Sequence, residues 1–127
     1  MKNKPVVIDA NIILRYLLND HPELSVKATS IIESNRLVIR TEVLCEVVYV
    51  LQKVYSVPRP AISKILADFM KLKQIVSSES EMLSVALKTY CKEKLDFVDC
   101  ILIALHETSE ADILSFDKQI CQHIGSG

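Results

Sequence analysis

Residues 5–18 of the chain read Pro-Val-Val-Ile-Asp-Ala-Asn-Ile-Ile-Leu-Arg-Tyr-Leu-Leu. The first part, Pro5–Ile8, is a continuous apolar run with β-branched residues, which is typical of a buried parallel strand. Asp9 ends this run, and the apolar residues after it recur with the period of an amphipathic helix. The stretch therefore predicts a strand followed at once by a helix, with a carboxylate at the junction.

Short apolar runs of this kind alternate along the chain with longer segments of helical period. Strands are expected at Pro5–Ile8, Leu37–Arg40, Gln74–Ser77 and Asp112–Phe116. Helices are expected around Ile12–Leu17, Val43–Val54, Ile62–Leu72, Met82–Tyr90 and Val98–Leu105, with Pro58 and Pro60 marking a helical hairpin between the second and third strands. Such alternation favours parallel β-α units with right-handed crossovers. The predicted fold class is α/β, with three layers and a small parallel sheet of about four strands flanked by helices.

The length and composition favour a compact helical chain of one domain, residues 1–127. Only two glycines occur in the 127 residues, both at the C-terminal end, so tight β-hairpins are not expected. Cys45, Cys91, Cys100 and Cys121 lie in apolar segments without a C-x-x-C pair, as expected of reduced core residues in a cytosolic protein. Polar residues interrupt the apolar N-terminal run, so neither a signal peptide nor a membrane span is expected and the predicted location is the cytoplasm.

Four acidic residues lie inside or against apolar stretches: Asp9, Glu46, Asp99 and Asp117. Burying an ionised carboxylate without a partner is costly, and three of the four have no Lys or Arg beside them in the sequence. A shared divalent cation would satisfy all four. The formal net charge is −1, but with these four set aside 12 acidic residues remain against 15 basic ones, so the rest of the surface can still attract phosphate.

Three of the four acids, all except Glu46, also have a simpler explanation as residues that stabilise the start of a helix. Asp9 or Asn11 can cap the first helix, and Asp117 the last one. Asp96 can cap the helix that contains Asp99, whose charge would then favour the helix N-terminus. Glu42 is explained in the same way, because a negative charge near the start of its helix interacts favourably with the helix dipole. Glu46 is not, since it lies one turn further into the helix, between apolar residues. In an open α/β sheet the carboxyl ends of the strands share one edge, so the four acids can converge there.

As an ordered set, these segments resemble the PIN-domain ribonucleases, in particular the VapC toxins of toxin–antitoxin pairs. The resemblance lies in four blocks that span nearly the whole chain: Val7–Leu18, Thr41–Leu51, Leu95–Ala104 and Ile113–Lys118. It implies that Asp9, Glu46, Asp99 and Asp117 are the catalytic acids and metal ligands. Asn11, Glu42, Asp96 and Ser115 are expected around them, with Ser115 where the family often has Thr or Ser. Residues 118–127 leave little room for a further short strand often found in the family.

An oxygen-only ligand set suits one or two Mg²⁺ or Mn²⁺ ions, which activate water and neutralise charge on a phosphodiester. The expected function is a metal-dependent endoribonuclease, a hydrolase, with RNA as substrate. The resemblance further implies a small antitoxin partner and a homodimer.

Two alternatives remain at this point. A receiver-type phospho-acceptor domain would need an adjacent acidic pair after the first strand, where the chain has only Asp9 followed by alanine. A PIN-like module that binds RNA or protein without catalysis is the other.

Overall fold

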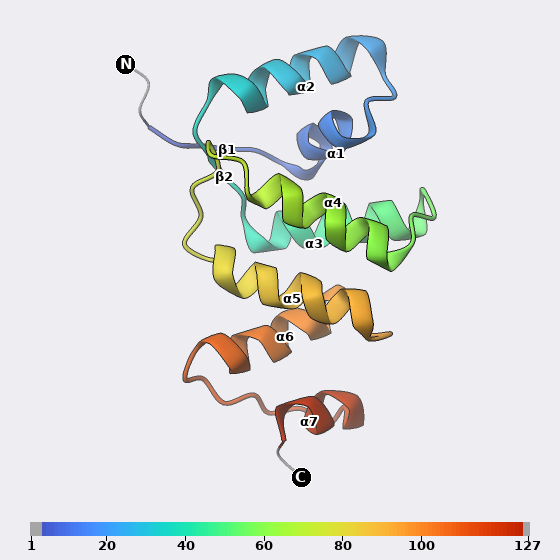
Figure 1. The fold of residues 1–127 in the computed structure, drawn as a ribbon, viewed down its shortest axis with the longest axis vertical. Coiled ribbons are helices and arrows are strands. Elements are labelled where there is room, and N and C mark those ends of the chain that lie inside the picture. The colour runs from blue at the N-terminus through green and yellow to red at the C-terminus, as the bar shows by residue number, and fades with distance from the viewer. Residues whose placement is uncertain (1–3, 126–127) are drawn as a thin grey trace.

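The computed structural model describes residues 4–125. Its elements are β1 (Val6–Val7), α1 (Ala10–Leu18), α2 (Pro22–Ser34), β2 (Leu37–Val38), α3 (Thr41–Lys53), α4 (Arg59–Met70), α5 (Ser80–Lys92), α6 (Phe97–Thr108) and α7 (Lys118–Ile124). The fold is mostly helical with a small parallel sheet, consistent with the expected three-layer α/β/α class. Helix α2 lies on one side of the strands and α3 and α4 on the other, while α5, α6 and α7 extend the molecule downward (Figure 1).

The five predicted helices all form, and α3 and α4 make the predicted hairpin on either side of Pro58. Their apolar stripes meet in one core, whose largest fully buried side chains include Ile13, Ile32, Leu37, Leu44, Leu51, Ile62, Leu66, Leu83, Leu87, Tyr90 and Ile103. Helix α2 is not predicted by apolar spacing, because its first half is mostly polar or exposed. It begins where Pro22 follows His21, whose Nδ1 accepts a hydrogen bond from the Leu24 amide at 3.1 Å.

The sheet is smaller than predicted. Strands β1 and β2 pair in parallel, with Val6 opposite Leu37 and Val7 opposite Val38. The expected third strand is reduced to one parallel bridge between Leu37 and Ile75, with the Leu37 amide donating to the Gln74 carbonyl at 2.8 Å. A turn closed by the Ile75 amide and the Leu72 carbonyl precedes the bridge, and a turn in which the Glu79 amide donates to the Ser77 hydroxyl leads into α5 at Ser80.

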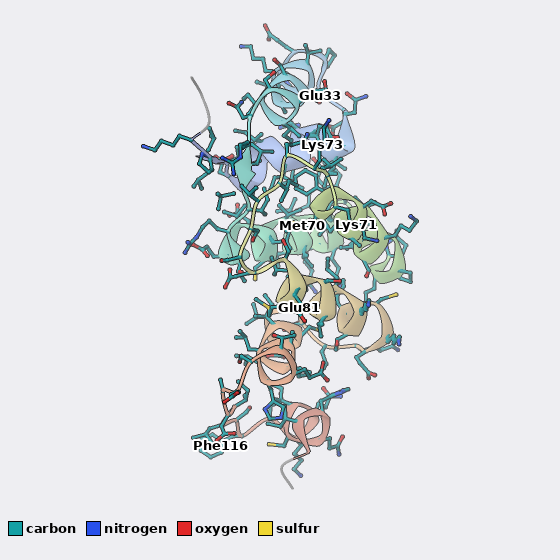
Figure 2. The ribbon with its side chains drawn as sticks, turned by 60° about the vertical axis from the view of Figure 1, so that its left-hand side comes forward. Glu33, Met70, Lys71, Lys73, Glu81 and Phe116 are labelled. Carbon is teal, nitrogen blue, oxygen red and sulfur yellow. The ribbon has the colours of Figure 1, made fainter. Side chains whose placement is uncertain are left out.

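The predicted strand at Asp112–Phe116 is wrong. Among the described residues this segment pairs with no strand, and it lies at the α7 end of the molecule, away from β1 and β2 (Figure 1). Leu114 is 95% exposed, and Phe116 points fully into solvent (Figure 2). The expectation that the first strand is buried on both faces is also wrong, since Val7 is 60% exposed.

The cysteines are all free, but they are not all core residues. Only Cys100 is buried, and burial raises its pKa to about 12; Cys45, Cys91 and Cys121 are half-buried. No helix in residues 4–125 is long and apolar enough to cross a membrane.

Candidate active site

Asp99 lies in the first turn of α6 and is half-buried. Burial raises the pKa of its carboxyl, and the negative charges of Asp96 and Asp117 raise it further. The side chain has no hydrogen-bond donor among the residues that the structure describes. Asp99 is therefore a carboxylate held close to like charges without a cation to neutralise it, which is uncommon outside functional sites.

Arg59 holds the turn between α5 and α6, and with it the position of Asp99. Its Nη1 donates to the carbonyls of Glu93 at 2.9 Å and Leu95 at 2.7 Å, and more weakly to that of Tyr90 at 3.3 Å. The guanidinium also lies 4.3 Å from the centre of the Tyr90 ring. A charged group that satisfies the carbonyls at the end of α5 fixes where the next helix begins.

Asp96 occupies the N-cap position of α6, as predicted, but its side chain makes no capping hydrogen bond. Asp117 does cap α7: its Oδ1 accepts from the amides of Gln119 at 2.9 Å and Ile120 at 3.2 Å. The Ser115 hydroxyl accepts from the Asp117 amide at 3.0 Å and so shapes the turn before α7. The Asp96 carboxylate is thus left facing solvent beside Asp99, while that of Asp117 is partly satisfied.

Helix α7 packs against α6 and lies close to the turn after α5. Ile120 is buried, and His123 Nε2 lies 3.6 Å from Glu93 Oε1 in the turn after α5. This packing places Asp117 close enough to Asp99 for its charge to raise the pKa of Asp99. Three of the predicted residues, Asp96, Asp99 and Asp117, are therefore gathered at one place.

A cleft of about 470 Å³ lies between α3 and α6, and we call it the α3–α6 cleft. It is lined by Cys45, Val48, Tyr49, Gln52 and Lys53 of α3 and by residues 96–99 at the start of α6. Its volume lies within the range of about 300–1,000 Å³ that is usual for small-ligand sites. Asp96 and Asp99 thus face a space in which part of a substrate can sit.

Asp9 immediately precedes α1 and caps it. Its Oδ1 accepts a hydrogen bond from the Ile12 amide at 3.2 Å, and its side chain is exposed. The capping alternative considered for Asp9 is therefore observed, and Asn11, also exposed, does not share it.

Glu46 lines a second cleft, of about 330 Å³, which we call the α1–α3 cleft. The lining residues are Asn11, Leu14, Arg15 and Leu18 of α1 with Glu46, Val50, Val54 and Tyr55. The Arg15 guanidinium lies 3.4 Å from Asp20, and the described residues show no ion pair between Arg15 and Glu46. Glu46 therefore keeps a free carboxylate in a cleft that Asn11 shares.

Helix α3 lies between the two groups of acids, since it contacts both α1 and α6. Glu46 and Tyr49 are three residues apart on α3, so their Cβ atoms are only about 5–6 Å apart. Tyr49 lines the α3–α6 cleft, whereas Glu46 lines the α1–α3 cleft. The clefts are therefore neighbours across one helix, and Glu46 borders the site of Asp99 without entering it.

The premise that all four acids are buried is wrong. Asp9, Glu46 and Asp117 are exposed, and only Asp99 is half-buried. The apolar neighbours in sequence point into the core while the acids, at helix starts or on the outer stripe of α3, point outward. Glu42 is a surface residue paired with Arg40 at 3.2 Å, where a backbone hydrogen bond and the Arg40 side chain lower its pKa.

These carboxylates fit a divalent cation in chemistry and charge but not in arrangement. Carboxylate oxygens are the donors that Mg²⁺ and Mn²⁺ prefer, and the like charges around Asp99 are those that a cation neutralises. Across residues 4–125, however, no three His, Cys, Asp or Glu side chains are positioned to hold an ion. The structure thus supplies candidate ligands without a complete coordination sphere.

The sequence analysis gave no role to Tyr49, Gln52 or Lys53, which line the α3–α6 cleft. A signal for Tyr49 and Lys53 was present, since they extend the polar stripe of Glu42 and Glu46 along α3 with spacings of three and four. What the sequence could not show is which neighbouring helix that stripe faces.

A model of the PIN domain family matches residues 6–124. No curated protein and no solved structure matches the chain. The family match covers all the described elements, from β1 to the end of α7, and includes every acid discussed above. The chain therefore belongs to the PIN domain family, whose members are generally nucleases.

Proposed function

We propose that this protein is an endoribonuclease that hydrolyses RNA phosphodiester bonds with the help of Mg²⁺ or Mn²⁺. The observation that carries the proposal is Asp99: a half-buried carboxylate, crowded by the charges of Asp96 and Asp117, beside a cleft in a PIN-domain chain. A cation would relieve that repulsion and would attract a phosphate that the acids alone repel.

In the proposed site Asp9, Glu46, Asp99 and Asp117 carry the reaction as metal ligands, with one or two ions. A bound ion would supply an activated water molecule and would neutralise charge on the phosphate and the leaving oxygen. The capping bonds of Asp9 and Asp117 fix the direction of one oxygen each and leave the other free to bind. Attack by water with departure of the 3′ oxygen gives products with 5′-phosphate and 3′-hydroxyl ends.

The remaining predicted residues act around these ligands in the proposal. Ser115 holds the turn that presents Asp117, through its bond to the Asp117 amide. Asp96, which makes no capping bond, would accept a hydrogen bond from water, and Asn11, which lines the cleft of Glu46, would donate one to it. Glu42 stays a surface residue of α3, three to four residues before Cys45 and Glu46.

We further propose the role of a VapC-like toxin, working in the cytoplasm as a homodimer and held inactive by a small antitoxin. Support comes from exposed apolar side chains that a partner would cover: Val54, Tyr55, Ile65, Leu114 and Phe116. Four cysteines without a disulfide support the cytoplasmic location. Light scattering on the purified protein tests the dimer, and a monomer at all concentrations would contradict it.

Incubation of the purified protein with single-stranded and structured RNA tests the proposed activity. With Mg²⁺ or Mn²⁺ we expect internal cleavage and 5′-phosphate ends, and with EDTA we expect intact RNA. RNA that is bound but never cut, with either ion, would instead favour the non-catalytic PIN-like module. Cleavage that is equally fast in EDTA would overturn the metal dependence. The family match speaks against the receiver-type alternative, which has no support in the structure.

A further inference from the structure

We propose that the α3–α6 cleft is a subsite for one nucleotide of single-stranded RNA, with the base stacked on Tyr49 and a phosphate bound by Lys53. The inference rests on the proposed ribonuclease function and adds how the substrate is held. It concerns residues to which no catalytic role has been given.

Tyr49 offers the stacking surface. Its side chain is 61% exposed although it lies in the middle of α3, and it faces the cleft rather than the core. Val98, which is 55% exposed, lines the same cleft from the start of α6. An aromatic ring on one wall and an apolar side chain on the other make a slot suited to a flat base, because unstacked RNA bases bind between such side chains.

Lys53 offers the phosphate contact. It lies four residues after Tyr49, and therefore on the same face of α3, and it also lines the cleft. It is the only basic side chain that lines this cleft, and among the described residues it makes no ion pair or hydrogen bond. A free ammonium beside an exposed tyrosine is the usual pairing in sites that bind single strands.

Gln52 adds hydrogen-bonding capacity between these two residues. Its Oε1 accepts a hydrogen bond from the Tyr90 hydroxyl at 2.9 Å, which fixes the amide and leaves its Nε2 donors for a ligand. Base edges present the acceptors that such donors need. The cleft thus contains a stacking surface, a fixed polar group and a cation in order along α3.

The acids on the α6 wall of the cleft link this subsite to the proposed reaction. Asp96 and Asp99 form its α6 wall, so a nucleotide seated on Tyr49 has its backbone next to the acids. A purely apolar partner segment would fit less well, because it would leave Lys53 and both acids unpaired on entering the cleft. The chemistry of the lining therefore favours a nucleotide over an apolar peptide.

Equilibrium binding of a short fluorescent single-stranded RNA, measured by anisotropy over a salt series with Ca²⁺ as the divalent ion and the RNA checked to be intact, tests the subsite without cleavage. Tyr49→Ala should weaken binding about 5- to 100-fold at every salt concentration, whereas Tyr49→Phe, which keeps the ring, should bind like wild type. Lys53→Ala should reduce the slope of log K against log salt by about 0.7, the loss of one phosphate contact. Lys27→Ala is the matched control: the same charge is removed from an exposed position on α2, a helix that does not line the cleft.

The outcomes separate this inference from the proposed function. If RNA binds and is cleaved, but Tyr49→Ala and Lys53→Ala bind as wild type does, the subsite is wrong and the ribonuclease stands. If Tyr49→Phe loses as much affinity as Tyr49→Ala, the hydroxyl and not stacking holds the ligand, and the inference fails. If wild type neither binds nor cleaves RNA, both proposals fail. Thermal unfolding of each variant ensures that a loss of binding is not a loss of folding.

Discussion

The carboxylates of Asp96 and Asp99 repel each other across the first turn of α6. Burial raises the pKa of Asp99, and the charges of Asp96 and then of Asp117 raise it further. Asp96 makes no capping hydrogen bond that would hold its charge away from its neighbour. This unrelieved repulsion, at the edge of a cleft, distinguishes Asp99 from the other acids of the chain and makes it the centre of the proposed site.

Asp96→Asn should lower the pKa of Asp99 towards its ordinary value of 3.8, because one of the repelling charges is removed. Carbon-13 NMR titration of the Asp99 carboxyl in EDTA measures this directly. Since the folded pKa is raised, ionised Asp99 destabilises the folded state above that pKa, and the penalty disappears as pH falls below 3.8. An Asp99 pKa unchanged in Asp96→Asn would show that the shift comes from burial and from Asp117, and not from Asp96.

Mn²⁺ titration tests which acids hold the ion. We expect paramagnetic broadening first at Asp96, Asp99 and Asp117, and weaker Mn²⁺ binding by about tenfold or more in both Asp9→Asn and Glu46→Gln. Changes in the outer shell of a metal site already cost about 10- to 100-fold, and loss of a ligand should cost at least as much. Unchanged affinity in both variants would restrict the site to the three acids near α6.

Arg59→Ala should destabilise the protein by about 2–4 kcal/mol. The estimate combines charge-assisted hydrogen bonds to the Glu93 and Leu95 carbonyls with the contact to the Tyr90 ring. Urea unfolding followed by circular dichroism measures the loss. Lys64→Ala serves as control, since the exposed pair of Lys64 with Asp68 at 2.8 Å should contribute less than about 1 kcal/mol. Equal effects of the two substitutions would contradict the role given to Arg59.

Backbone amides of Ile113, Leu114 and Phe116 should exchange with solvent far faster than those of Ile103 and Ala104 in α6. The first group has no strand partner among the described residues, whereas the second lies in a buried helix. Hydrogen exchange followed by NMR or mass spectrometry measures the difference. Strong protection of Leu114 would mean that this segment pairs as a strand, as its apolar pattern suggests.

Five of the helices were predictable because their apolar faces are strongly periodic, and most apolar residues of α3 and α6 lie in the core as expected, although Tyr49 and Val98 are exposed. The absence of a strand at Asp112–Phe116 was not predictable. Ile113, Leu114 and Phe116 resemble a buried apolar run, and nothing in the sequence fixes where this segment packs. The apolar neighbours of the acids also wrongly suggested that the acids are buried. Glu46 lies between Cys45 and Val47, yet the geometry of the helix directs its carboxylate outward.

For the site, the strand-end rule predicts that the acids meet at one edge of the sheet, but among the described residues Asp117 follows no strand, and no three acids are positioned to hold one ion. The rule also does not say on which side of an intervening helix each acid falls. Glu46 and Asp99 line different clefts, one on each side of α3. The packing of α1 and α6 against α3 decides which cleft each acid lines.

The central claim is that Asp99 serves metal-dependent RNA cleavage, and the rate of cleavage by Asp99→Asn in Mg²⁺ or Mn²⁺ tests it most directly. The substitution keeps the shape and removes the charge, so the rate should fall about 100-fold or more. Asp112→Asn is the matched control, an exposed aspartate that lines neither cleft, and it should cleave at the wild-type rate. Undiminished cleavage by Asp99→Asn, with Asp112→Asn also fully active, would contradict the account.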